Sequence, residues 1–275
     1  MTPFQIIFCF FKIMIHNERN KIIMKIMTTF LITIFAIFFV IYLLMITNKY
    51  SLIFPQNKYY KKSSIYEEVF INTKQGKMVS WYYEGDKDKP AILYFHGNGE
   101  SIATIDLDYL KRDNYTLLVV EYPEYAINKG KINEDNVMEV ALENYNFLKE
   151  KQENIILYGF SIGTGIASKL ASIVKADKLI LKSPFYSIED VVSYWPCSFL
   201  FTPWTKGIFT SYKYLQELPN IKLLIVHGTA DKIVPFPSGK KLYESAPTKS
   251  KKFIQVDNGG HNELVYENII KELDN

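Results

Sequence analysis

A charge-free apolar stretch near the N-terminus constrains this chain more than any other feature. Residues 26–48 (IMTTFLITIFAIFFVIYLLMITN) contain no charged side chain. About 20 apolar residues are enough for a helix to cross a bilayer, and a core helix rarely stays apolar on every face over that length. The stretch therefore predicts a transmembrane helix, with a buried core helix as the alternative.

The charges on either side of this stretch favour one orientation. Arg19, Lys21 and Lys25 precede it, whereas Lys49 is the one near basic residue that follows, although lysines further downstream reduce the asymmetry. Because positive flanks stay on the cytoplasmic side, we expect the N-terminus inside and the following domain outside, in a periplasm or lumen. No small-residue cleavage site follows the stretch, which favours an uncleaved signal anchor over a signal peptide.

The predicted transmembrane helix divides the chain into four segments. Residues 1–25 form an N-terminal segment, 26–48 the anchor, and 49–65 a juxtamembrane linker rich in tyrosine and lysine. Residues 66–275 are long enough for one domain with a sizeable core. We therefore expect a single-pass membrane protein with one folded domain.

Composition and motifs exclude several classes of function. The chain carries 32 basic and 29 acidic residues, a net charge of +3, which argues against a nucleic-acid partner. There is no H-E-x-x-H motif, no paired cysteines and no Walker A or G-x-G-x-x-G motif, so neither a metal nor a nucleotide cofactor is predicted. Cys9 and Cys197 lie on opposite sides of the apolar stretch, which leaves no disulfide within the domain.

Short apolar runs alternate with helical patterns through the domain. Strands are expected at residues 78–84, 91–97, 115–122, 154–160, 177–183, 223–228 and 253–258. Helices are expected at residues 134–151, from about 161, at 238–245 and at the C-terminus. Continuous apolar strands separated by helices indicate an α/β fold with a mostly parallel sheet covered on both faces.

Three reactive residue types follow three of these strands. Ser161 lies in G-F-S-I-G (159–163), Asp231 in HGTADKIVP and His261 in DNGGHNE. Ligands bind at the carboxyl ends of strands in such sheets, and Ser-Asp-His is the chain order of the α/β-hydrolase triad. The pattern predicts a serine nucleophile, an imidazole base and an orienting carboxylate.

The chemistry requires these residue types. An imidazole must take the proton of a serine hydroxyl during attack, and a carboxylate holds that imidazole in the right tautomer. Gly159 and Gly163 leave room for a strand that turns abruptly into a helix at Ser161. Backbone N–H groups of Ile162 and of Asn98, in the glycine loop HGNGES, are the predicted oxyanion donors.

Structural interpretations of the same residues remain as alternatives. Ser161 could be a small packing residue in a turn, and His261 a surface histidine. Asp231 could serve an Asx turn, with Asp190 and Asp257 as rival acids. His96 and His227 each stand in a strand-end His-Gly pair, where a structural hydrogen-bonding role is expected.

Six blocks resemble the successive signatures of serine α/β-hydrolases. They are HGNGES, EYPEYAINKG, GFSIGTGIA, SPFYSIED, VHGTADKIVPF and GGHNEL. The resemblance covers about residues 66–275 and is closest to the membrane-anchored subgroup of the Bem46, ABHD12, ABHD13 and ABHD17 type. It implies the α/β-hydrolase fold, ester or thioester hydrolysis through an acyl-enzyme, and lipid or acyl substrates. By motif position, it implies Ser161 as nucleophile, Asp231 as acid and His261 as base.

The chain departs from this family pattern in one loop. Relatives usually have glycines where EYPEYA has Glu124 and Ala126. The departure affects the expected shape of the loop beside the pocket and leaves the triad positions unchanged.

Residues 184–220 leave the strand–helix pattern and are rich in aromatic side chains. Hydrolases of this fold commonly insert a small cap here. The aromatic side chains are expected either to form an apolar lid over an acyl pocket or to pack the core of the domain.

These features together predict a membrane-anchored serine hydrolase. Its expected substrate is a carboxylic ester, a lysolipid or an acyl-thioester. A serine peptidase of the same fold is one alternative, because such peptidases share the triad order. A non-catalytic hydrolase-fold protein that binds at the membrane is the other.

Overall fold

The computed structural model describes residues 18–263, 269 and 271–273, and the chain divides into two compact units, residues 1–49 and 50–275. Cys9 and most of the expected C-terminal helix lie outside the described residues.

The first unit contains one long helix, α2 (Glu18–Thr47). None of its 30 residues is buried, so it is not the core helix considered as the alternative. It is long and apolar enough to cross a membrane. The hydroxyl groups of Thr33 and Thr47 donate to backbone carbonyls one turn earlier, at 2.8 and 3.0 Å, so both are satisfied without water.

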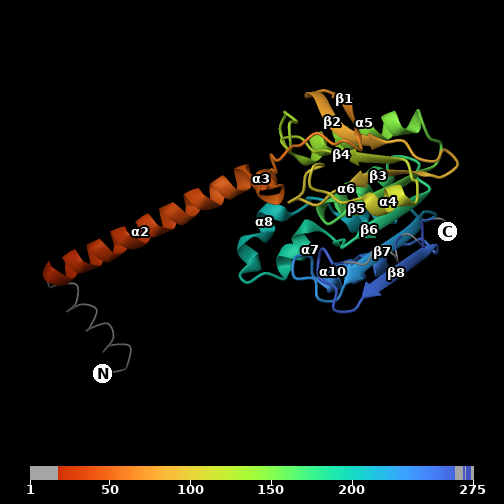
Figure 1. Ribbon diagram of the computed structural model, residues 1–275. Coiled ribbons are helices and arrows are strands. Elements are labelled where there is room, and N and C mark those ends of the chain that lie inside the picture. The colour runs from red at the N-terminus through yellow and green to blue at the C-terminus, as the bar shows by residue number, and fades with distance from the viewer. Residues whose placement is uncertain (1–17, 264–268, 270, 274–275) are drawn as a thin grey trace. The chain divides into compact units, whose positions relative to one another are not determined.

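The second unit is built on an eight-stranded sheet in the order β1-β2-β4-β3-β5-β6-β7-β8 (Figure 1). The strands are β1 (Glu67–Thr73), β2 (Gly76–Tyr83), β3 (Ala91–Phe95), β4 (Leu117–Val120), β5 (Ile155–Phe160), β6 (Lys178–Lys182), β7 (Lys222–Gly228) and β8 (Lys251–Val256). β1 and β2 run antiparallel to their neighbours, and β3 through β8 are parallel to one another. The predicted α/β-hydrolase architecture with a mostly parallel sheet is confirmed.

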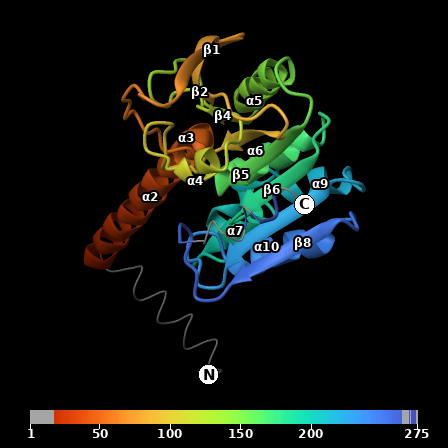
Figure 2. The same cartoon turned by 45° about the vertical axis from the view of Figure 1, so that its right-hand side comes forward.

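The described helices of this unit are short apart from three. They are α3 (Lys49–Ile53, which begins at the boundary of the units), α4 (Asp108–Arg112), α5 (Glu134–Lys149), α6 (Ile162–Ala171), α7 (Ile188–Ser193), the 3₁₀ helix η1 (Ser198–Leu200), α8 (Thr202–Thr205), α9 (Ser211–Gln216) and α10 (Phe236–Ser245). In Figures 1 and 2 they cover both faces of the sheet. α3, α7 and α8 lie on the side toward which the parallel strands point (Figure 1).

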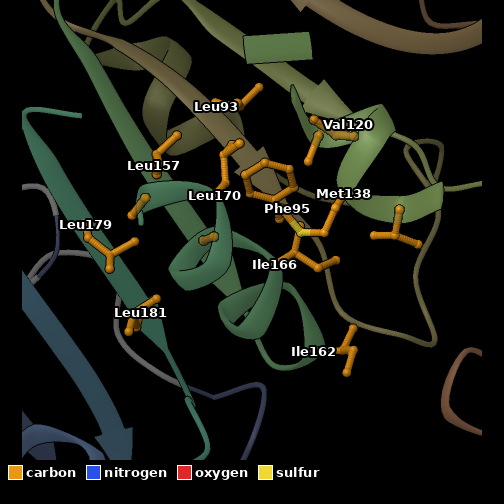
Figure 3. Close-up of a cluster of buried hydrophobic side chains, with 14 of the residues drawn as sticks. Leu93, Phe95, Val120, Met138, Leu157, Ile162, Ile166, Leu170, Leu179 and Leu181 are labelled. Atoms are coloured by element: carbon orange, nitrogen blue, oxygen red, sulfur yellow. The ribbon is translucent and has the colours of Figure 1, made fainter. Parts of the chain in front are cut away.

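Alternating side chains of the central strands form two cores, one on each face of the sheet. In β3, Leu93 and Phe95 point to the core beneath α5 and α6, and Ile92 and Tyr94 point to the core that contains Leu110 of α4. Figure 3 shows the first core around Phe95. Burial on both faces explains why these strands read as continuous apolar runs in the sequence.

Residues 50–59, expected as part of a linker at 49–65, pack against the sheet domain. Phe54 is fully buried, with its ring 5.8 Å from that of Tyr122 and 6.1 Å from that of Phe209, both edge-on. The Asn57 side chain donates to the Gly99 carbonyl at 3.0 Å. The folded unit therefore begins directly after α2.

The cap region 184–220 divides its aromatic side chains between core and surface. Phe185 and Phe209 are fully buried, and Trp204 is nearly so. Trp195 and Phe199 are exposed, Phe199 to 72%. The buried rings of Phe185 and Phe209 fit the expected core role, and the expected lid over an acyl pocket stays a prediction.

Replacement of Phe54 by alanine tests whether the segment after α2 belongs to the fold. We expect Phe54→Ala to lower the free energy of unfolding by about 3–5 kcal/mol, because a fully buried ring leaves a cavity. Denaturant unfolding of the full chain in detergent measures the change. Ile65→Ala, at a side chain that is 52% exposed, is the matched control and should change stability by no more than about 0.5 kcal/mol. Equal effects would mean that the segment is a free linker.

Candidate active site

Ser161 lies at a sharp turn between β5 and α6. It has φ 52° and ψ −120°, a left-handed conformation that is strained for a residue with a side chain. A Cβ atom at Gly159 would lie 2.4 Å from the Gly163 carbonyl oxygen, and one at Gly163 would lie 2.2 Å from the Phe95 carbonyl oxygen. Both glycines of G-x-S-x-G are therefore required by space, as the sequence predicts.

Ser161, His261 and Asp231 form one hydrogen-bonded chain. The Ser161 hydroxyl lies 2.9 Å from His261 Nε2, and His261 Nδ1 lies 2.7 Å from Asp231 Oδ2. In this arrangement Nδ1–H donates to the carboxylate, which leaves Nε2 to accept the serine proton. The structure brings together the three residues that the sequence singled out from three strand ends.

Asp231 is held ionised by its surroundings. The backbone N–H groups of Ile233 and Val234 each donate to Oδ1 at 2.9 Å, and His227 Nε2 lies 3.4 Å from Oδ2. Burial raises the pKa of Asp231, but the hydrogen bonds from His227 and His261 lower it by more, so the net pKa is well below the ordinary range. The carboxylate remains charged across the physiological range.

The rival residues have other partners. Asp190 accepts from the Ser238 hydroxyl at 2.5 Å and pairs with Lys241 at 2.7 Å. Asp257 accepts from the Gln255 side chain at 2.7 Å. His227 is fully buried, and its Nε2–H donates to the Val234 carbonyl at 3.0 Å, which agrees with a structural role.

The two proposed oxyanion donors border the same cavity as Ser161. Ile162 is the first residue of α6, where a backbone N–H has no acceptor within the helix. The position of Asn98 is fixed at two points: its carbonyl accepts from the Tyr125 hydroxyl at 2.7 Å, and its side chain donates to the Ile53 carbonyl at 3.2 Å.

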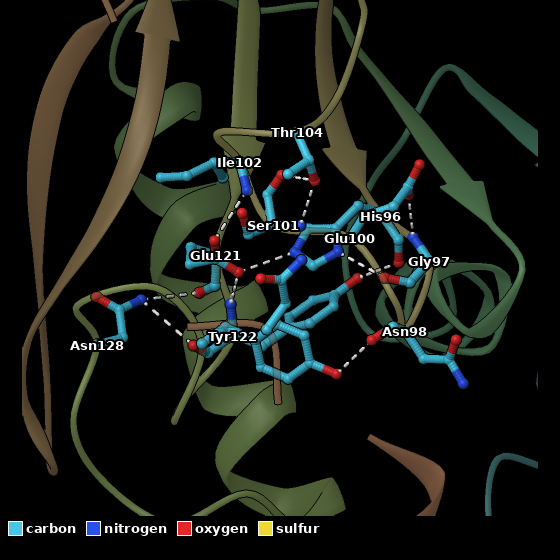
Figure 4. A network of polar contacts seen from close by, with 12 residues as sticks. His96, Gly97, Asn98, Glu100, Ser101, Ile102, Thr104, Glu121, Tyr122 and Asn128 are labelled. Atoms are coloured by element: carbon cyan, nitrogen blue, oxygen red, sulfur yellow. Dashed lines mark hydrogen bonds and ion pairs between the residues drawn. The ribbon is translucent and has the colours of Figure 1, made fainter. Parts of the chain in front are cut away.

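A buried ion pair lies behind the glycine loop, and sequence reasoning missed its acidic member. His96 Nε2 lies 2.9 Å from Glu121 Oε1, and His96 Nδ1 lies 2.7 Å from the Gly97 carbonyl (Figure 4). Both ring nitrogens therefore face acceptors, an arrangement that a doubly protonated imidazolium satisfies. The other carboxylate oxygen accepts from the Ile102 N–H at 2.9 Å, so Glu121 fixes both ends of the loop.

This environment shifts the pKa of His96. Burial lowers it, but the charge and hydrogen bond of Glu121 raise it by more, and the net pKa lies above the ordinary value of 6.5. No sequence signal links His96 with Glu121, since the two residues follow different strands. The one feature that could have singled out Glu121 is its position directly after the apolar strand β4 (Leu117–Val120).

The loop that departs from the family pattern carries backbone strain. Glu124 and Ala126, the two residues of EYPEYA singled out in the sequence, have φ of 65° and 45°. Contacts from the segment after α2 hold both residues: Gln56 donates to the Glu124 carboxylate at 3.0 Å, and the Ala126 N–H donates to the Asn57 carbonyl at 2.8 Å. Both residues thus hold a left-handed backbone conformation although neither is glycine.

An apolar cavity of about 160 Å³ opens at Ser161. Its walls come from α7 and α8, from the loops after β6 and β7, and from α3. The cap contributes Val192, Trp195 and Trp204. Beyond Ser161, Asn98 and Thr205, the lining is hydrocarbon or aromatic.

Comparison with known families decides the class of protein. The model of the serine hydrolase family FSH1 matches residues 57–262, which is well over half of the chain and includes Ser161, Asp231 and His261. The chain belongs to the FSH1 serine hydrolases.

Curated relatives of this serine hydrolase fall in the subgroup that the sequence blocks suggested. Lysophosphatidylserine lipase ABHD12 of Xenopus tropicalis is 29% identical over an alignment of 202 residues, and the match covers 64% of this chain and 52% of the relative. Alpha/beta hydrolase domain-containing protein 17C of the same organism is 29% identical over an alignment of 194 residues, and the match covers 66% of this chain and 59% of the relative. The chain thus spans between half and three fifths of the length of these relatives.

Solved structures share the fold of this serine hydrolase. An esterase of Pyrococcus furiosus has a TM-score of 0.64 at 18% identity, covering 79% of this chain and 95% of the esterase. An alpha-beta hydrolase of Vibrio vulnificus has a TM-score of 0.66 at 21% identity, covering 76% and 81%.

The stability contribution of the His96–Glu121 pair should depend on pH. The folded-state pKa of His96 is above its unfolded value, so the contribution is complete below about pH 6.5 and is lost as the pH rises through the folded-state pKa. Relative to a double variant, His96→Gln with Glu121→Gln, the hydrolase should lose at most about 1.4 kcal/mol for each pH unit in that window. Denaturant unfolding of both proteins between about pH 5.5 and 9 measures the difference. A difference that grows with pH would contradict the assignment.

Proposed function

We propose that this protein is a membrane-anchored hydrolase that cleaves carboxylic ester or thioester bonds of acyl substrates, with Ser161, His261 and Asp231 as its triad. The observation that carries the proposal is the continuous hydrogen-bonded chain from the Asp231 carboxylate through His261 to the Ser161 hydroxyl. Membership of a serine hydrolase family supports the assignment of a serine as the nucleophile.

The geometry supports a two-step reaction. His261 Nε2 takes the proton of Ser161 as the oxygen attacks the substrate carbonyl, and the N–H groups of Ile162 and Asn98 stabilise the oxyanion. The imidazolium then gives that proton to the leaving alkoxide or thiolate, which leaves an acyl-enzyme. Water, deprotonated by His261, attacks this ester, and the carboxylic acid departs as Ser161 regains its proton.

The apolar cavity supports an acyl substrate. Its lining from α7 and α8 offers no charged group to a polar substrate but buries hydrocarbon well. One relative is named a lysophosphatidylserine lipase, and a single-chain lipid or another acylated molecule would suit such a cavity. α2 serves as the proposed anchor, with the N-terminus inside and the hydrolase domain outside.

Active-site labelling tests the nucleophile. The full chain in detergent should react with a fluorophosphonate probe, and Ser161→Ala should abolish labelling and reduce ester hydrolysis by several orders of magnitude, on the order of 10⁶ at most. Ser172→Ala, in the turn after the same helix, is the matched control and should label normally. A folded wild type that is not labelled would instead indicate a non-catalytic binding protein.

Filling the cavity tests the acyl pocket. Val192→Trp, at a buried lining residue, should leave hydrolysis of p-nitrophenyl acetate largely unchanged and slow that of the octanoate by at least about tenfold, since each buried methylene contributes about 0.8 kcal/mol. Ile173→Trp, at a side chain that is 60% exposed, should alter neither rate. An equal loss on both esters would show that the cavity does not hold the acyl chain.

A further inference from the structure

Six large apolar side chains are exposed around the mouth of the active-site cavity. They are Leu52, Tyr194, Trp195, Phe199, Leu200 and Ile233, exposed to between 47% and 72%. Leu52, Trp195 and Ile233 also line the cavity, Tyr194 directly precedes Trp195 at the end of α7, and Phe199 and Leu200 follow in η1. We call these six residues the mouth patch.

Aromatic rings continue from the mouth patch into the cavity wall. Trp195 meets Phe201 edge-on at 6.0 Å, and Phe201 meets Trp204 edge-on at 6.2 Å. Trp204 is buried and lines the cavity. An apolar route therefore runs from the surface of the molecule to the space beside Ser161.

Two of the three segments that form the mouth patch carry lysines and no carboxylates, whereas the third has Asp231 and Lys232 beside Ile233. Residues 191–216 contain Lys206 and Lys213 but neither aspartate nor glutamate, and the same holds for residues 49–63 with their four lysines. Exposed aromatic rings on segments that carry lysines match the interface of a bilayer, where rings lie at the headgroup level and ammonium groups meet phosphates.

The covalent chain limits how far one residue of the mouth patch, Leu52, can lie from the end of α2. Leu52 follows Thr47, the last residue of α2, by five positions. Because each residue spans at most about 3.6 Å, Leu52 lies no more than about 18 Å from that end. If α2 crosses a membrane, the cavity mouth is therefore tethered near its surface.

We propose that the mouth patch docks on the lipid bilayer, so that a single-chain acyl lipid passes from the membrane into the cavity without crossing water. This inference rests on the proposed function, since it takes α2 as the anchor and Ser161 as the nucleophile. It adds the surface by which the domain contacts the membrane and the route by which substrate enters.

Tryptophan quenching measures the contact directly. The full chain is reconstituted in phosphatidylcholine vesicles whose acyl chains carry bromine, a quencher that acts only at short range. Trp81 and Trp204 are buried, whereas Trp195 is 47% exposed. Brominated vesicles should quench the wild type more than Trp195→Phe, and unbrominated vesicles should quench neither.

Activity toward two substrates then tests the route. Phe199→Ser with Leu200→Ser, in the mouth patch but outside the cavity lining, should slow hydrolysis of lysophosphatidylcholine held in the vesicles by about tenfold, because two apolar side chains lose membrane burial. Hydrolysis of soluble p-nitrophenyl acetate should not change. Ile173→Ser, an equally exposed apolar residue outside the patch, should alter neither rate.

Three outcomes would overturn the docking surface: unquenched Trp195, equal effects of the double variant on both substrates, or a dimer in detergent that the double variant abolishes. The last would assign the patch to a second copy of the chain. Loss of fluorophosphonate labelling or failure of the chain to float with the vesicles would instead contradict the proposed function, so the two failures are distinguishable.

Discussion

The candidate site depends on the close contact between the start of α6 and the end of β3. Gly163 lies so near the Phe95 carbonyl that no side chain fits between them. With α6 held there, β5 must turn sharply, and Ser161 takes the left-handed conformation that projects its hydroxyl from the turn. The same contact brings the first N–H of α6 beside the glycine loop that follows β3. One steric constraint thus sets the nucleophile and both proposed oxyanion donors.

Of the three proposed triad residues, His261 follows the strand that lies farthest from β5 in the sheet. It follows β8, which β6 and β7 separate from β5 in the sheet. The loop after β8 can pack against the end of β7 because Gly228 has no side chain. A Cβ atom at Gly228 would lie 2.1 Å from the Gly259 carbonyl oxygen. The Ser183 hydroxyl donates to the His261 carbonyl at 3.1 Å. The imidazole is therefore placed by backbone packing on the intervening strands.

Sequence reasoning reached the parts of this arrangement that local patterns encode. β3 through β7 were predictable because their buried runs are mostly apolar and end at glycine or polar residues, and β2 was predictable from its alternating pattern. β8 was also predicted, although none of its residues is fully buried. β1 was not predicted, since its sequence EEVFINT mixes two glutamates and an asparagine with its apolar residues. The packed segment at 50–59 was interpreted as a linker because Phe54 is its only buried residue and polar or lysine residues follow it. Glu121 was missed because its partner His96 lies on another strand, and only the β3–β4 pairing brings them together.

The segment after α2 also joins the two loops that border the oxyanion donors. Asn57 donates to Gly99 of the glycine loop and accepts from Ala126 of the loop after β4. Positive φ at Glu124 and Ala126 costs on the order of 1–3 kcal/mol for each residue, a cost that glycine would avoid. These contacts offset that strain, since without them both residues would be free to relax toward negative φ. The shape of the active-site rim in this chain is thus set partly by the residues that continue directly from the proposed membrane anchor.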